Sequence, residues 1–313
     1  MTSIFFTTDV HGSDICWNKF INAGKFYNAQ VLILGGDMTG KAIVPLIHSG
    51  NCTYRTVLLE QETITHGEDE LQAVVKRIRS RGYYPYLTNP DEISEINRQP
   101  ERIHQLFKQE VLNTLQRWLE IADTKLKNTG IRCYVAPGND DMFEIDEMIR
   151  SSTSVQLAEG QVIEIDGQHE MISSGYTNPT PWHTYREEGE DQLQIRYEAM
   201  IRQLKKPQRA IFNFHAPPFA STLDDAPEMT VDLRPRYAGN SLVPVGSKAG
   251  RKVIETSQPL LGLHGHIHEA RGTARIGKTL CINPGSMYEQ GSLMGALINL
   301  GKDKVENFLL TSG

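Results

Sequence analysis

The chain has 313 residues, a formal net charge of −6 and a pI of about 5.9. This length allows one large domain or two small ones. The mildly acidic balance argues against binding to nucleic acids or anionic membranes, because both require a basic surface. The four cysteines form no C-x-x-C pair and no apolar run is long enough to span a membrane, so we expect a cytoplasmic protein without a secretory signal.

The first elements along the chain predict a sheet with parallel strands and helices packed on it. Residues 3–8 and 31–34 are short, apolar, β-rich runs, and a helical pattern lies between them. Residues 53–59 are predicted as a third strand. A β-α-β start of this kind is typical of α/β folds.

A helical insertion is predicted at residues 60–130. Its apolar side chains recur at helical spacing over residues 71–78 and again over residues 103–126. Residues 82–92 are predicted as the connection between these two helices. The insertion can serve as a cap, as a surface for self-association or as a plain covering layer.

Strand patterns return after the insertion at eight places. They are residues 131–136, 162–165, 171–173, 210–214, 260–263, 279–282, 293–299 and 305–310. The late strands lack long intervening helices, which favours a second sheet with antiparallel pairs. Residues 175–191 and 216–247 are long irregular segments, and loops of this length in a compact domain are often functional.

Polar residues that suit metal binding follow directly after several of the apolar strands. In an extended chain, residues i and i+2 point to the same side, so an Asp-x-His and a Gly-His-x-His stretch each bring two side chains together. The full set is Asp9, His11, Asp37, Asn139, His215, His266 and His268. Sites in open α/β sheets gather beyond the carboxyl ends of the strands, so we expect these residues to meet.

In their order along the chain, these motifs resemble the signature of the calcineurin-like metallophosphoesterase superfamily. The signature runs Asp-x-His, Gly-Asp, Gly-Asn-His-Asp/Glu, a lone His and Gly-His-x-His, and here it extends from residue 9 to about residue 286. The resemblance implies an α/β fold with a two-sheet sandwich flanked by helices in four layers (αββα). Residues 1–313 would then form a single domain that includes the helical insertion at 60–130.

The resemblance also implies a binuclear metal centre, in which the seven residues divide into two sets and one shared ligand. The sets are Asp9, His11 and His268 for one ion, Asn139, His215 and His266 for the other, and Asp37 as the bridge. Carboxylate, imidazole and amide ligands together suit Mn, Fe or Zn better than Ca. Two such ions roughly 3.5–4 Å apart can clamp a phosphoryl oxygen and turn a shared water into hydroxide. The implied protein is a metal-dependent phosphoric ester hydrolase, a phosphodiesterase or phosphatase acting on a small phosphate ester.

The third motif departs from the signature, because Asp140 stands where the family has His. In the family, this His is taken to stabilise or protonate the leaving-group oxygen, and the acid that follows it, here Asp141, orients it. A carboxyl group with the ordinary pKa of about 3.9 is ionised at neutral pH and donates no proton. We expect the nearby cations to outweigh the opposing effect of Asp141 and to keep Asp140 ionised. The sequence therefore predicts a preference for phosphodiesters or activated esters over alkyl monoesters.

The irregular segment 175–191 supplies candidates for substrate binding. Trp182, His183 and Arg186 lie within it, and His183 is a candidate to replace the missing acid. Local packing is the alternative role of Trp182.

Two hypotheses remain for the role of the protein. The intact set of predicted ligands favours an enzyme, whereas Asp140 leaves open a catalytically weak phosphoesterase-like scaffold or regulatory binding protein. Tyr83, Tyr84 and Tyr86 cluster near a predicted helix connection and favour a homo-oligomer. A monomer, with the insertion as a covering layer, is the alternative.

Overall fold

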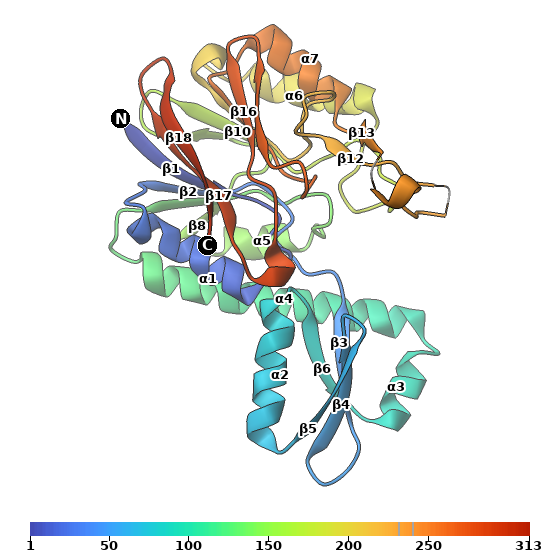
Figure 1. Cartoon of the computed structure of the whole chain (residues 1–313). Coiled ribbons are helices and arrows are strands. Elements are labelled where there is room, and N and C mark those ends of the chain that lie inside the picture. The colour runs from blue at the N-terminus through green and yellow to red at the C-terminus, as the bar shows by residue number, and fades with distance from the viewer. Residues whose placement is uncertain (231, 240) are drawn as a thin grey trace.

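Two six-stranded sheets lie face to face, and helices cover the outer face of each (Figure 1). The structure is a computed structural model that describes residues 1–230, 232–239 and 241–313. The four layers confirm the predicted α/β fold, a two-sheet sandwich flanked by helices.

The first sheet contains both the start and the end of the chain. Its strands, in spatial order, are β18 (Val305–Ser312), β17 (Met294–Leu300), β1 (Thr2–Thr7), β2 (Val31–Leu34), β7 (Arg132–Val135) and β8 (Val155–Leu157). Strands β1, β2, β7 and β8 are parallel, whereas β17 runs antiparallel to β1 and to β18. The prediction that the late strands form a second sheet is therefore wrong for β17 and β18, which pair beside β1 instead.

The second sheet is parallel at its centre and antiparallel at both edges. Its strands, in spatial order, are β15 (Gly272–Ile276), β16 (Thr279–Asn283), β14 (Leu261–Leu263), β11 (Ile211–Phe214), β10 (Glu170–Ser174) and β9 (Val162–Glu164). Only the outer pairs, β15 with β16 and β9 with β10, are antiparallel. The predicted antiparallel pairs are thus present, but at the edges only.

Apolar side chains fill all three spaces between the layers. Helices α1 (Asp14–Phe26), α4 (Pro100–Leu126) and α5 (Ile145–Arg150) pack on the first sheet, and α6 (Glu190–Ile201) and α7 (Lys248–Ser257) pack on the second. In β1, Ile4 and Phe6 face the second sheet, whereas Phe5 faces the helices. Strands that are buried on both faces need apolar residues at every position, which is why this part of the sequence shows no polar alternation.

The chain between β2 and β7 forms a separate lobe, which we call the inserted lobe (residues 43–126). It projects from the sandwich in Figure 1. Its four strands, in spatial order, are β5 (Gln61–His66), β4 (Thr53–Leu58), β3 (Ile43–His48) and β6 (Tyr84–Thr88). Helices α2 (Glu68–Ser80) and α3 (Pro90–Ile96) complete it, together with one end of α4.

The structure of the inserted lobe differs from the predictions in three respects. The helices expected between residues 60 and 130 are present, but the lobe begins earlier and also contains a sheet. The third strand predicted at residues 53–59 is present as β4, but it pairs with β3 and β5 of the lobe and not with β1 or β2. Residues 82–92 were predicted as a connection, yet β6 lies there and pairs in parallel with β3. Strands this short carry too few side chains for their partners to be identified from the sequence.

The tyrosines on which self-association was predicted are engaged within the chain. Tyr84 is buried in the core and its hydroxyl accepts a hydrogen bond from Gly40 N. The hydroxyls of Tyr83 and Tyr86 donate to Glu289 and Glu92. A homo-oligomer stays a prediction, but this cluster no longer supplies a surface for it.

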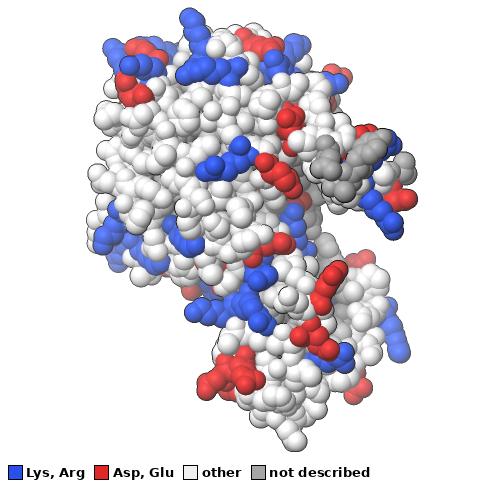
Figure 2. All heavy atoms as spheres, viewed as in Figure 1, with Lys and Arg blue, Asp and Glu red and all other residues white. Residues whose placement is uncertain are grey.

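Charged side chains of both signs are interspersed on the face of the molecule shown in Figure 2. Across the described residues, no helix combines the length and the apolar character needed to cross a membrane.

Candidate metal centre

Loops at the carboxyl ends of strands from both sheets bring the predicted ligands together. Each ligand follows a strand: Asp9 and His11 follow β1, Asp37 follows β2, Asn139 follows β7, His215 follows β11, and His266 and His268 follow β14. Five of them are buried, whereas His266 is partly buried and His268 is one-quarter exposed. The site therefore lies at the seam between the two sheets, beyond their strand ends.

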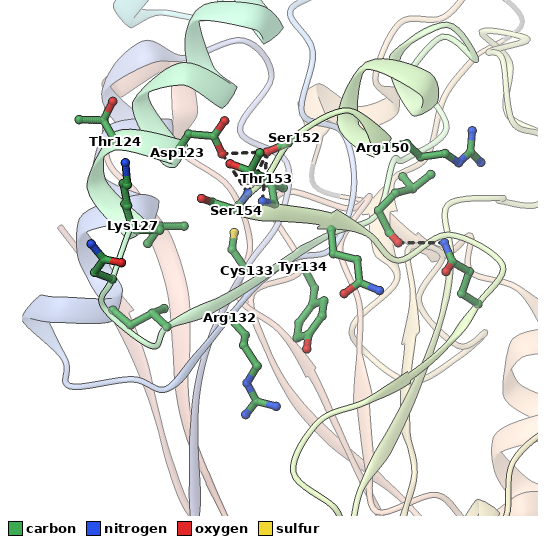
Figure 3. A pocket seen from close by; sticks show the side chains of 17 residues that line it. Asp123, Thr124, Lys127, Arg132, Cys133, Tyr134, Arg150, Ser152, Thr153 and Ser154 are labelled. Carbon is green, nitrogen blue, oxygen red and sulfur yellow. Dashed lines mark hydrogen bonds between the residues drawn. The ribbon is translucent and has the colours of Figure 1, made fainter.

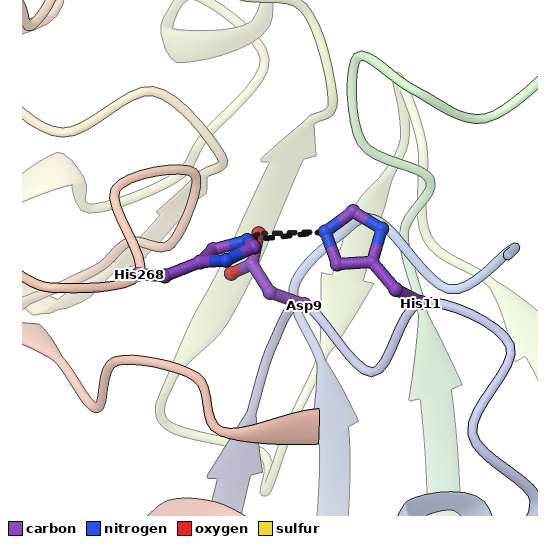
Figure 4. A group of neighbouring side chains, drawn as sticks. All are labelled: Asp9, His11 and His268. Carbon is purple, nitrogen blue, oxygen red and sulfur yellow. Dashed lines mark hydrogen bonds and ion pairs between the residues drawn. The ribbon is translucent and has the colours of Figure 1, made fainter. Parts of the chain in front are cut away.

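Asp9, His11 and His268 form the first of three overlapping groups and are drawn in Figure 4; the third group is His11, Asp37 and Asp140. The Nε2 atoms of His11 and His268 are 3.1 Å apart, and His268 Nε2 is 3.4 Å from Asp9 Oδ1. The two imidazoles and the carboxylate thus converge on one point from three directions. This arrangement can hold a divalent cation.

Asp37, His215 and His266 form the second group. Asp37 Oδ2 is 3.4 Å from His215 Nε2 in its own group and 3.6 Å from His11 Nε2 in the first group. One carboxylate oxygen therefore faces both groups. This is the position that a bridging ligand needs.

Asn139 presents its side-chain oxygen as a free acceptor. Its Nδ2 donates to Thr184 Oγ1 at 2.8 Å, and its Oδ1 is buried without a hydrogen-bond partner. His215 shows the same pattern, because its Nδ1 donates to the carbonyl of Gly35 and its buried Nε2 has no hydrogen-bond partner. Buried polar atoms rarely stay unpartnered, so both atoms point to a missing ligand.

The backbone is strained at four of the predicted ligands. Asp9, His11, Asp37 and His266 have φ angles of 53°, 36°, 48° and 67°, in the left-handed region that non-glycine residues rarely adopt. Each such residue costs on the order of 1–3 kcal/mol and persists only where the surrounding structure enforces it. Strain concentrated in this way is typical of a functional site.

A glycine precedes three of the ligands because there is no room for a side chain. A Cβ atom on Gly36, Gly138 or Gly265 would collide with another ligand of the cluster, which is His215, Asp37 or Asp9, respectively. The Gly-Asp, Gly-Asn and Gly-His pairs of the sequence are thus explained by the close approach of these loops.

The buried carboxylates and imidazoles of the cluster shift one another's pKa values. Burial would lower the pKa of His215, but the carboxylates of Asp37 and Asp9 raise it to about 10. Burial would raise the pKa of Asp9, yet His215 and His268 hold it below its usual range. Burial lowers the pKa of His266 to about 4, so this imidazole is neutral, the form in which histidine binds metals. These clusters of Asp and His side chains can therefore bind metal ions.

Asp141 ties two ligand loops together. Its buried carboxylate accepts hydrogen bonds from the backbone N–H groups of Met38 at 3.0 Å, Thr39 at 2.9 Å and Gly138 at 2.8 Å. It thereby fixes the loop that carries Asp37 against the loop that carries Asn139. Its carboxylate is occupied with these contacts, so its role here is to position the ligand loops and not to orient Asp140.

Asp140 lies at the rim of the cluster and pairs with a lysine that the sequence analysis missed. Its Oδ2 is 3.3 Å from Lys41 Nζ and 4.0 Å from His11 Nδ1. Burial and the charge of Asp37 raise the pKa of Asp140 to about 6, against the effect of Lys41, so the group is mainly ionised at neutral pH. Lys41 lies four residues after Asp37 on the same loop, and this short spacing is the feature of the sequence from which its place near the site could have been predicted.

Arg186 corrects a prediction, because it is buried and does not face the cluster. Only 1% of it is exposed. Its guanidinium donates to the carbonyls of Asp141 and Met142 and to the carboxylate of Asp146. Arg186 therefore braces the loop that carries Asn139 and is not free for substrate.

Replacing Arg186 with alanine is expected to destabilise the protein by about 3 kcal/mol, because it leaves Asp146 and two carbonyls without their donor. Urea denaturation measures the loss. The matched control is Arg150→Ala, since Arg150 is half exposed and pairs with the exposed Glu147, and it should change stability by less than about 0.5 kcal/mol. Equal losses in both variants would contradict the bracing role.

The other residues of this loop differ in their contact with the site. Thr184 contacts Asn139, whereas Trp182 and His183 are exposed, and His183 has a left-handed backbone with φ 52°. A substrate contact by either exposed residue stays a proposal. The ring of Tyr288, which the sequence analysis also missed, lies 4.8 Å from that of His11 and lines the first group.

A hollow of about 1260 Å³ lies at the opposite end of β7 (Figure 3). Arg132 at the start of β7 lines it, together with Asp123, Lys127 and Arg150. None of the possible metal-binding groups among the described residues includes a residue of this hollow. The hollow is therefore separate from the candidate metal-binding groups.

Comparison with known proteins supports the fold. No family model matches the chain. An uncharacterised protein of Methanocaldococcus jannaschii is 30% identical over 151 residues, which are 47% of this chain, and the match spans only 61% of that protein's length. The crystal structure of TT1561 of Thermus thermophilus aligns over 100% of this chain and 98% of its own, with a TM-score of 0.54 and 13% identity. A further solved structure aligns over 98% of both chains, with a TM-score of 0.57 and 15% identity. The chain shares the fold of these two structures.

Proposed function

We propose that the protein is a metal-dependent phosphoric ester hydrolase that resembles the calcineurin-like metallophosphoesterases. The observation that supports this proposal best is the position of Asp37 between two ligand groups, with one oxygen within 3.6 Å of a histidine nitrogen from each. The order of the motifs along the sequence supports the proposal independently, because the motifs follow five different strands and their side chains meet at one site.

The proposed ligands are those predicted from the sequence. Asp9, His11 and His268 would hold one ion, Asn139, His215 and His266 the other, and Asp37 both. Bound ions of this type polarise phosphoryl oxygens and lower the pKa of water. The neighbouring residues keep the ligands in place: Gly35 orients His215, and Asp141 holds the ligand loops.

We propose phosphodiesters or activated esters as the preferred substrates. Asp140 places a carboxylate at the rim of the site, and this charge repels the dianion of a monoester more than the monoanion of a diester. A carboxylate also provides no proton for an alkoxide leaving group.

The experiment is a substrate panel on protein that has been freed of metal and then reloaded. Bis(4-nitrophenyl) phosphate, 4-nitrophenyl phosphate and an alkyl monoester are each offered to the metal-free protein and to protein loaded with Mn, Fe, Zn or Mg. We expect diester hydrolysis only after loading, and little turnover of the alkyl monoester. Two bound metals without turnover of any ester would instead favour the phosphoesterase-like scaffold.

A further inference from the structure

Lys41 is the basic side chain closest to the chemistry of the site. Its ammonium group forms an ion pair with the carboxylate of Asp140. Among the described residues, no other Lys or Arg forms an ion pair with Asp9, Asp37, Asp140 or Asp141. Its side chain is 46% exposed. The ammonium group therefore reaches the rim of the metal centre and keeps access to solvent and to an incoming molecule.

The backbone around Lys41 is held by hydrogen bonds and close packing before any ligand binds. Gly40 N donates to the buried hydroxyl of Tyr84 at 2.7 Å, and a Cβ on Gly40 would collide with the carbonyl of Gly82. On the other side, Thr39 is bound to Asp141 through both its backbone N–H and its hydroxyl. Little ordering of the chain is then needed when Lys41 meets a ligand, which is the requirement for electrostatic stabilisation.

Lys41 also changes the electrostatics of Asp140. The ammonium of Lys41, 3.3 Å from the carboxylate of Asp140, offsets part of its charge, so the monoanion of a phosphodiester meets less repulsion at this rim than it would from a lone carboxylate. Burial is the largest cause that lowers the pKa of His11, and the positive charge of Lys41 lowers it further. The charge of Lys41 therefore acts on the cluster as well as on Asp140. Asp140 in turn limits the positions open to the flexible lysine side chain.

We propose that Lys41, held by Asp140, donates a hydrogen bond from its ammonium group to the leaving-group oxygen of a phosphodiester substrate. The inference rests on the proposed function and adds the residue that assists the leaving group. During hydrolysis the water oxygen bonds to phosphorus, and the bond from phosphorus to the leaving oxygen breaks. The attacking water gives up a proton to solvent. The electron pair of the broken bond stays on the leaving oxygen, next to the positive charge of Lys41, and this oxygen then takes a proton from solvent.

Other basic residues near the site are less suited to this role. Arg186 is buried and spends its donors on Asp141, Met142 and Asp146. His183 is exposed on a loop and follows the exposed Trp182. Lys41 lies on the same loop as the proposed bridging ligand Asp37, so its position is tied to the centre.

The test compares Lys41→Met, Lys41→Arg and the wild type on methyl phenyl phosphate and methyl 4-nitrophenyl phosphate. Phenolate is the more basic leaving group and needs more stabilisation. We expect Lys41→Met to lower kcat by about 10²–10³-fold for the phenyl ester and by less than about tenfold for the nitrophenyl ester. Lys41→Arg keeps the charge and should retain activity within about tenfold on both esters.

Lys205→Met is the matched control, because Lys205 pairs with Glu170 at 3.7 Å on a remote surface. It should match the wild type on both esters. Metal content and Tm of every variant show whether the fold and the centre are intact. Equal losses of Lys41→Met on the two esters, or no loss, would overturn the role of Lys41 while the proposed function stands.

A second measurement separates this inference from the proposed function. If the metal-loaded wild type hydrolyses neither ester, the proposed function fails, and isothermal titration with inorganic orthophosphate then tests Lys41 as an anion contact. At least tenfold weaker binding by Lys41→Met than by wild type and Lys41→Arg would support that contact. Equal affinities, or no binding by the wild type, would overturn it.

Discussion

Asp37→Ala is expected to lose both metal ions and to lower hydrolytic activity by roughly 10³-fold or more, because bound ions contribute several kcal/mol to the transition state. The reason is geometric, since Asp37 Oδ2 lies within 3.6 Å of His11 Nε2 and of His215 Nε2. The substitution also removes the negative charge that balances the positive charge of two cations in a buried site. Elemental analysis after metal loading, together with the rate on bis(4-nitrophenyl) phosphate, measures both effects.

Asp303→Ala is the control for this variant, because Asp303 is exposed and pairs with Arg209, and neither residue belongs to the possible metal-binding groups of the described residues. It should keep about two metals per chain and the activity of the wild type. His268→Ala adds a graded comparison, since His268 belongs to one group only and should cost mainly one ion. If Asp37→Ala kept full metal content, the assignment of Asp37 as the bridge would be wrong.

Asp140→His is expected to raise the turnover of alkyl monoesters selectively. It places an imidazole, which can donate a proton near neutral pH, where the wild type has a carboxylate. A positioned general acid contributes about 10²–10⁴-fold when the leaving group is an alkoxide and almost nothing when it is a nitrophenolate. The measurement is a rate series over leaving groups of increasing basicity, for the wild type and the variant.

Asp140→Asn separates the two effects of this substitution. It removes the carboxylate charge but supplies no acid, so it should improve binding of monoesters without raising the turnover of alkyl monoesters. Because it also loosens the hold on Lys41, the rate should depend on the leaving group at least as steeply as in the wild type. The selective gain should appear with histidine alone. Two results would show that the missing acid at position 140 does not limit the rate. One is a wild-type rate that is limited by the chemical step and does not change with leaving-group basicity. The other is an equal rise in alkyl monoester turnover in Asp140→Asn and Asp140→His.

The sandwich could be predicted because its strands are short apolar runs with a polar residue at the end of each. Ile4, Phe5 and Phe6 must all be buried, so the run they form is continuous and easy to recognise. Asp9 and His11 were identified for a related reason, since their i, i+2 spacing after a strand fixes their common direction.

The inserted lobe could not be predicted in full from the same signals. Its strand β4 carries Arg55 and the exposed Val57, a mixture that does not distinguish a strand of a small sheet from a strand of the main sheet. The partner of a strand depends on where the chain turns, and here the chain leaves the first sheet after β2 and returns only at β7.

The chemistry of the rim depends on contacts between distant loops. Lys41 meets Asp140 across about a hundred positions of sequence, and Arg186 braces the Asn139 loop from within a segment that suggested a substrate contact. A lone Lys or Arg has no periodic pattern that predicts its partner. Both roles became visible only from the distances and burial of the folded chain.

Metal stoichiometry against activity tests the central claim most directly. Protein freed of metal with a chelator is titrated with Mn while bound metal and the hydrolysis of bis(4-nitrophenyl) phosphate are followed together. A binuclear centre predicts that binding saturates at about two ions per chain, with little activity until the second ion is bound. Saturation at one ion or fewer, or hydrolysis that is equal in the metal-free protein, would contradict it.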